Sequence, residues 1–161
     1  MQNSKKIKII DSCISGVYFK NSSDIINRFG DLSQLIVSLP NDFPQIGILS
    51  KDSLETLMLS AWPGDGKNEF RYYKIKNYEE RTLDITYIQS EISSFISCEG
   101  IKLGLNKESV VELMGNNYVK QQLKDLKIEI YLYENPEYLY QAKYYFSNDK
   151  LVEFEYGYVY P

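Results

Sequence analysis

The sequence has no histidine among its 161 residues, and this absence excludes several kinds of active site. Ser-His and Cys-His nucleophile pairs need an imidazole as the general base, and many zinc sites need it as a ligand. The carboxylates Glu153 and Glu155 alternate with apolar residues, which is typical of a solvated sheet face rather than a glycosidase cleft. We therefore expect a protein that is not an enzyme and that holds neither a metal nor a cofactor.

Clustered positive charge is also missing. Residues 1–124 carry 15 acidic and 15 basic side chains, whereas residues 125–161 carry 7 acidic and 3 basic ones. Nucleic-acid binding requires clustered Lys and Arg that displace counterions from phosphates. The distribution argues against a nucleic-acid partner, and the acidic C-terminal part permits a basic protein partner.

Long apolar runs are absent as well. No stretch approaches the 18 or more apolar residues that span a bilayer, so we expect no membrane span. Near the N-terminus the apolar run IKII is too short for the core of a signal peptide. If Met1 is the native start, the expected location is the cytoplasm. A gene that encodes a signal sequence would instead place the protein in the periplasm.

Cysteine occurs only twice, at Cys13 and Cys98. The two residues are either small buried apolar side chains in a reducing compartment or a single disulfide that ties the two halves of the chain together. The sequence leaves both alternatives open.

One phrase occurs twice, as GVYFKNSSDIINRFG at residues 16–30 and as GIKLGLNKESVVELMG at residues 100–115. In each copy, polar residues precede two adjacent aliphatic residues and a closing glycine. Ser22 or Ser23 is expected to cap the first helix and Asn106 to open the second, because such side chains accept bonds from free backbone N–H groups. Glycine is the usual helix terminator. Each phrase therefore predicts a short capped helix.

Further segments alternate apolar and polar residues or are rich in aromatic and β-branched residues, as strands are. Each half of the chain thus predicts short helices packed on a small antiparallel β-sheet meander. The expected fold class is α+β, with two tandem repeats, residues 1–92 and 93–161, packed together as one unit. The predicted strands are residues 55–61, 69–76, 81–88, 127–133, 138–146 and 151–159.

Tyrosine is abundant, with 10 of its 15 residues after position 117. In residues 127–133, one glutamate and two tyrosines alternate with aliphatic residues, which we expect to face the helices. The opposite face would then display tyrosines and carboxylates, a chemistry suited to protein recognition. Trp62, beside a predicted turn, either anchors its loop on the core or is exposed for binding. The predicted partner-binding residues are Glu129, Tyr131, Tyr133, Tyr145, Glu153, Glu155, Trp62 and Asp65.

The segment GLNKESVVELMG resembles the short motif of the SmpA/OmlA (BamE) lipoprotein family and of the β-lactamase inhibitor protein-like superfamily. The later segment YYFSNDKLVEFEY is similar to the closing hairpin of these families. The resemblance implies short helices on a small antiparallel sheet and, in the tandem form, a concave aromatic-rich sheet surface that grips an enzyme. The matching residues are Gly104, Asn106, Lys107, Glu108, Val110, Val111, Leu113 and Gly115.

These observations lead to a functional hypothesis of a non-enzymatic protein-binding or inhibitor protein. Its most concrete form is an immunity-type protein that sterically occludes a bacterial toxin or enzyme through the Tyr/Glu-rich sheet face. Tyrosines would supply contact area, and carboxylates would steer a basic partner. The alternative is an envelope scaffold domain of the BamE type that holds a larger assembly together.

Overall fold

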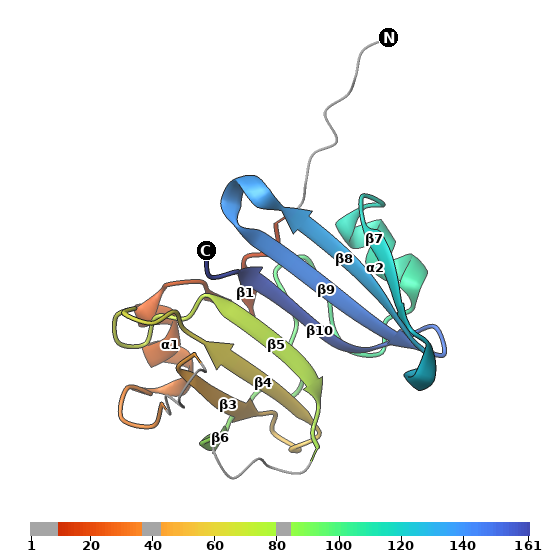
Figure 1. Ribbon diagram of the computed structural model, residues 1–161. Coiled ribbons are helices and arrows are strands. Elements are labelled where there is room, and N and C mark those ends of the chain that lie inside the picture. The colour runs from red at the N-terminus through yellow and green to blue at the C-terminus, as the bar shows by residue number, and fades with distance from the viewer. Residues whose placement is uncertain (1–9, 37–42, 80–84) are drawn as a thin grey trace.

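One mixed sheet of eight strands dominates the structure, a computed structural model that describes residues 10–36, 43–79 and 85–161. Its strand order is β6-β3-β4-β5-β10-β9-β8-β7 (Figure 1). A separate two-stranded sheet is formed by β1 (Cys13–Ile14) and β2 (Val17–Tyr18). The strands of the large sheet are β3 (Gln45–Leu49), β4 (Glu55–Ser60), β5 (Tyr72–Asn77), β6 (Tyr87–Gln89), β7 (Val119–Leu123), β8 (Ile128–Asn135), β9 (Tyr140–Ser147) and β10 (Lys150–Tyr158).

Two helices of eight residues each, α1 (Ser22–Phe29) and α2 (Lys107–Met114), form within the repeated phrase. The Asn106 side chain caps α2 as expected, and Asn21 caps α1 in place of the serines that follow it. The glycine after each helix has a φ near 85°, a conformation that glycine adopts without strain. Both helix predictions are confirmed.

The predicted fold class is wrong, because the two halves of the chain share one sheet. β10 pairs antiparallel with β5, from Glu153 opposite Lys76 to Gly157 opposite Tyr72. β6 joins β3 in parallel rather than closing a meander. The structure is mainly β, and no tandem repeat is evident. The predicted resemblance to the BamE and β-lactamase inhibitor families is wrong for the same reason, because it implied short helices on small sheets. The domain boundary at residue 92 stays a prediction.

Most predicted strands exist with ends shifted by a few residues, whereas β3 and β7 were not predicted. Of the segment 81–88, residues 81–84 lie outside the described residues, and β6 begins at Tyr87. β7 reads VKQQL, a mostly polar sequence that lacks the usual pattern of a half-buried strand. Strand patterns therefore missed one edge strand of the sheet, β7, and one inner strand, β3.

The junction between β5 and β10 is unusually close at Gly157. A Cβ atom at this position would lie 2.2 Å from the carbonyl oxygen of Arg71, and the residue has a φ of +144°. Only glycine tolerates both conditions. Because the Tyr158 N–H donates to the same Arg71 carbonyl at 2.9 Å, the two strands remain paired past this point.

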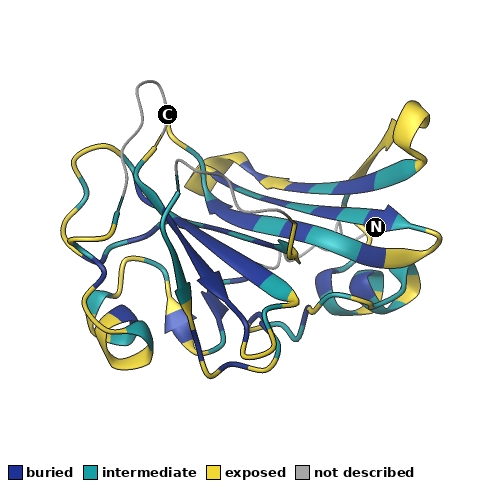
Figure 2. Cartoon of the chain, turned by 90° about the horizontal axis from the view of Figure 1, so that it is seen from below, coloured by how far each residue is buried: buried dark blue, intermediate teal, exposed yellow. Residues whose placement is uncertain are grey.

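One face of the sheet is covered by both helices, which Figure 2 shows on the same side, together with β1 and β2. Buried tyrosine hydroxyls tie this layer to the sheet. Tyr73 donates to the Val17 carbonyl (3.1 Å), and Tyr156 donates to the Cys13 carbonyl (2.5 Å). The side chains bury their rings and satisfy their hydroxyls on backbone oxygens, which explains why tyrosine suits this core.

The covering layer is closed by a disulfide between Cys13 and Cys98, so the structure selects the cross-linked alternative for the two cysteines. Around it, the Cys98 N–H donates to the Cys13 carbonyl (3.1 Å), and the Ser15 N–H donates to the Ile96 carbonyl (2.8 Å). A cross-link between residues 85 positions apart lowers the conformational entropy of the unfolded chain. In the chain-entropy model this raises the free energy of unfolding by about 4–5 kcal/mol. The disulfide thus holds the N-terminal segment against the middle of the chain.

The tyrosine hydroxyls of the core provide a matched pair of substitutions. Tyr144 and Tyr156 are both fully buried, but the Tyr144 hydroxyl has no hydrogen-bond partner among the described residues. We expect Tyr156→Phe to lower the free energy of unfolding by about 1 kcal/mol, because it leaves the Cys13 carbonyl without its donor. Tyr144→Phe should leave that free energy unchanged or raise it, because it removes an unpaired buried hydroxyl. Urea unfolding of both variants checks this, and equal losses would contradict it.

Candidate functional site

The face of the sheet opposite the helices is referred to below as the open face. Strand register brings charged and polar side chains of β5, β10 and β9 together at its centre. Lys74 pairs with Glu153 at 3.1 Å, and the Tyr145 hydroxyl donates to Glu155. The central residues of the open face are Tyr72, Lys74, Lys76, Glu153, Glu155, Gln141, Lys143 and Tyr145.

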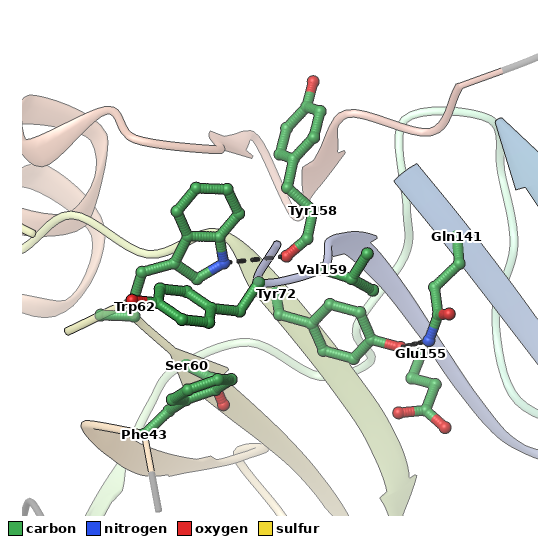
Figure 3. Close-up of a pocket in the computed structure, with 10 residues that line it drawn as sticks. Phe43, Ser60, Trp62, Tyr72, Gln141, Glu155, Tyr158 and Val159 are labelled. Atoms are coloured by element: carbon green, nitrogen blue, oxygen red, sulfur yellow. Dashed lines mark hydrogen bonds between the residues drawn. The ribbon is translucent and has the colours of Figure 1, made fainter. Parts of the chain in front are cut away.

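A cavity of about 300 Å³ opens at one end of this face, where β4 ends and β5 begins (Figure 3). Aromatic rings from four separate segments form most of its wall. Two of these rings are largely accessible, with 42% of Phe43 and 53% of Tyr160 exposed. This aromatic pocket is lined by Phe43, Trp62, Tyr72, Tyr158, Tyr160, Ser60, Ala61, Gln141, Glu155 and Val159.

The polar end of the aromatic pocket consists of a phenol, an amide and a carboxylate. The Gln141 amide nitrogen donates to the Tyr72 hydroxyl at 3.0 Å, and the Glu155 carboxylate lies beside them in Figure 3. Burial, and then the negative charge of Glu155, raise the pKa of the Tyr72 phenol well above its ordinary value. Tyr72 therefore stays neutral, and among the described residues Glu155 is the one charged side chain that lines this pocket.

Trp62 forms a wall of the pocket and is held in place from three directions. Its indole N–H donates to the Tyr158 carbonyl at 3.1 Å, and the Arg71 guanidinium lies 4.0 Å from the ring centroid. Asp65 accepts from the Trp62 backbone N–H (2.8 Å) and forms an ion pair with Arg71 (2.9 Å). Burial raises the pKa of Asp65, but the bonds from Arg71 and Trp62 outweigh it and lower the pKa overall.

Trp62 and Glu155 are thus the two sequence-predicted binding residues that line the aromatic pocket. Tyr145 supports Glu155 from outside the pocket, and Asp65 positions the Trp62 loop. The hairpin with Trp62 and Asp65 does not project freely, because the ring anchors on the end of β10.

Tyr131 and Tyr133 lie on the covered face, contrary to expectation. Only 7% and 6% of these residues is exposed. Tyr131 stacks on Tyr118 at 4.0 Å between ring centroids, and Tyr133 donates to the Gly115 carbonyl after α2. The helix packs against tyrosines rather than against the aliphatic residues of β8, so the two rings belong to the core.

The remaining predicted carboxylates form ion pairs elsewhere. Glu129 bridges Lys107 of α2 (2.6 Å) and Lys120 of β7 (2.9 Å), which links the helix to the edge of the sheet. Bonds from Lys107, partly opposed by burial, lower the pKa of Glu129. Glu153, paired with Lys74, lines a second hollow on the open face together with Leu123, Leu126 and Ile128.

Sequence reasoning missed most of the pocket wall. Tyr72, Gln141 and Tyr158 come from three strands, and Phe43 precedes β3. An aromatic-rich C-terminus, YGYVY, was the one local signal for Tyr158 and Tyr160. The pairing of β5 with β10 brings these residues together, and no motif marks that pairing.

Asp11 is the buried carboxyl that most resembles a catalytic acid. Burial raises its pKa to about 6, and hydrogen bonds from Ser97 and the Glu99 N–H oppose this rise. Its backbone N–H also donates to the Tyr140 hydroxyl (3.0 Å). Asp11 is fully buried and lines none of the cavities described above, so its contacts fasten the N-terminal segment rather than form a reaction site.

The described residues contain no group of three or more cysteine or carboxylate side chains that could hold a metal ion. Within the same residues, no helix is long and apolar enough to cross a membrane.

Comparisons with known proteins give little guidance. No protein-family model matches the sequence, and no curated protein sequence matches it. Among solved structures, an extracellular protein containing an SCP domain from Bacillus anthracis str. Ames is similar, with 9% sequence identity and a TM-score of 0.49. The match covers 98% of this chain and 50% of that protein, so the chain spans about half of its length. At this level of likeness, the site has to be interpreted from its own chemistry.

The environment of Asp11 predicts a specific pH dependence of stability. Its folded-state pKa of about 6 exceeds the ordinary value of 3.8, so the folded protein binds more protons than the unfolded chain between these values. As the pH rises from about 4 to about 6, the contribution of Asp11 to the free energy of unfolding should therefore decrease by roughly 3 kcal/mol.

The free energy of unfolding is measured as a function of pH for the parent protein and for Asp11→Asn. The difference between the two curves isolates the contribution of Asp11 from that of the other carboxylates. A carbon NMR titration of the Asp11 carboxyl measures the same pKa directly if the variant does not fold. An Asp11 that titrates near its ordinary pKa would contradict the prediction.

Proposed function

We propose that this chain is a non-enzymatic binding domain that docks a protein partner on the open face and holds a basic side chain of that partner in the aromatic pocket. The observation that supports this most strongly is the composition of the pocket, whose described residues combine aromatic walls with one carboxylate, that of Glu155. A cation over an aromatic face is attracted by the ring quadrupole, and aromatic cages commonly recognise ammonium groups.

The polar end of the pocket favours a hydrogen-bond donor as the ligand. Because the Gln141 amide nitrogen already donates to Tyr72, its carbonyl oxygen is the atom left to accept. Glu155 is hydrogen-bonded by the Tyr145 and Tyr72 hydroxyls, and because a carboxylate has about four lone-pair sites, it can accept further bonds. A Lys ammonium or Arg guanidinium has several N–H donors and matches this set of acceptors.

The size of the pocket supports a side chain rather than a whole cofactor. A volume of about 300 Å³ lies at the small end of ligand pockets. The walls are apolar enough to cover the methylene stem of Lys or Arg while the charged end reaches Glu155. The excess of carboxylates in residues 125–161 adds attraction for a basic partner.

A binding role also agrees with the chemistry of the chain better than catalysis does. The sequence has no imidazole, and Asp11, the carboxyl with a raised pKa in the core, lines none of the cavities described above. Such docking could sterically occlude a toxin or enzyme. The support for this form of the proposal is the chemistry of the open face and not a family resemblance. The Cys13–Cys98 disulfide favours an oxidising compartment over the cytoplasm as the place of action.

Trp62 provides a direct test, because the only tryptophan of the chain lines the pocket. Short alanine-based peptides with one central Arg or Lys should change its fluorescence saturably. The same peptides with norleucine or citrulline should bind at least about tenfold more weakly, because they lack the charge. Glu155→Gln should weaken binding of the Arg and Lys peptides by about tenfold or more.

Glu153→Gln is the matched control, since Glu153 lies on the same face of the same strand but outside the aromatic pocket. It should leave the affinity nearly unchanged. Equal affinity for charged and neutral peptides, or no effect of Glu155→Gln in a folded protein, would overturn the proposal.

A further inference from the structure

The outer edge of β7 lacks two of the protections that edge strands commonly have. β7 is the last strand of the sheet (Figure 1), and among the described strands only β8 pairs with it. All five of its residues are exposed. Natural edges are usually protected by proline, by a bulge, by short length or by charged residues such as lysine, because free backbone N–H and C=O groups recruit another strand.

β7 contains neither a bulge nor a proline, and its register with β8 is continuous from Val119 to Leu123. The one charged residue, Lys120, is already paired with Glu129 of the same chain at 2.9 Å. The edge is therefore free to form backbone hydrogen bonds with a further strand.

The sequence of β7 is complementary to itself in the antiparallel direction. If two copies pair about Gln121, each Val119 lies opposite Leu123 of the other copy, and each Lys120 lies opposite Gln122. The apolar pair falls on the open face, where Val119 and Leu123 are 60% and 44% exposed. No two like charges face each other, and such cross-strand apolar pairs stabilise a sheet.

We propose that β7 is a homodimerisation edge, at which two copies of this chain pair antiparallel about Gln121 and join their sheets into one. The arrangement has twofold symmetry, so each contact occurs twice. A strand of five residues is only about 17 Å long, which places the interface at the small end of specific interfaces. The dimer should therefore be reversible and dependent on concentration. β8 and β9 separate β7 from most of the aromatic pocket, so dimerisation leaves the pocket accessible.

Charged substitutions in β7 test both the dimer edge and its register. The monomer–dimer equilibrium of each variant is measured by sedimentation velocity over roughly a hundredfold range of concentration. The parent protein should shift from monomer to dimer as the concentration rises. Val119→Lys with Leu123→Lys places lysine opposite lysine in the proposed register and should weaken the dimer at least about tenfold. Val119→Lys with Leu123→Glu has the same number of substitutions, places lysine opposite glutamate, and should restore dimerisation.

Cross-linking gives a second and independent measurement. Both native cysteines are occupied by the intrachain disulfide, so an added cysteine is the only free one. Gln121→Cys lies opposite itself in the proposed register and should form a covalent dimer on mild oxidation. Val119→Cys, which lies opposite Leu123, should cross-link much more slowly.

A parent protein that stays monomeric over the whole concentration range would overturn the proposal. So would equal weakening by the two charge variants, or equal cross-linking at positions 119 and 121, because either result shows that the register is wrong. Far-UV circular dichroism and thermal unfolding verify that each variant is folded, which is expected because β7 is exposed along its length.

Discussion

The pairing of β5 with β10 is the interaction on which the rest of the structure depends. It joins a strand from the first half of the chain to the last strand and turns two small sets of strands into one sheet. Tyr73 and Tyr156 meet across this junction with ring centroids 5.8 Å apart, and Gly157 allows the close approach that continues the pairing. Without the junction, Tyr72 would not lie beside Gln141 and Glu155, and the aromatic pocket would have no polar end.

The abundance of tyrosine follows from how the opposite face is covered. Two short helices and a two-stranded sheet cannot supply a thick apolar layer, so loops lie directly on the sheet and bring backbone carbonyls into the core. A phenylalanine there would leave these carbonyls without donors, whereas tyrosine fills the volume and donates a hydrogen bond. Tyr73, Tyr133 and Tyr156 all do this, to Val17, Gly115 and Cys13. Most tyrosines of the sheet are thus structural.

This explains which features could be predicted from the sequence. Helix ends depend on neighbouring residues, so the caps near Asn106 and Gly115 were visible locally. Strand parity correctly put Glu129, Tyr131 and Tyr133 on one side, but the choice of the inner side failed because tyrosine was taken as a surface residue. Strand order and the pocket were not predictable, because both depend on the contact between β5 and β10, which are distant in sequence. The two copies of the repeated phrase have the same helix start and stop signals, but the strands that follow them are arranged differently.

The two faces of the sheet differ in whether their polar groups are available to a partner. On the covered face, buried hydroxyls such as those of Tyr73 and Tyr156 donate to backbone carbonyls, and the Asp11 carboxyl accepts from the Ser97 hydroxyl and from the Glu99 N–H. On the open face, Lys74 forms a cross-strand ion pair with Glu153. Glu155 accepts a hydrogen bond from Tyr145 and forms no ion pair among the described residues, so its negative charge remains for a ligand. The aromatic pocket and the β7 edge are therefore two places where the described part of this chain can bind a partner, one through charge and one through its backbone.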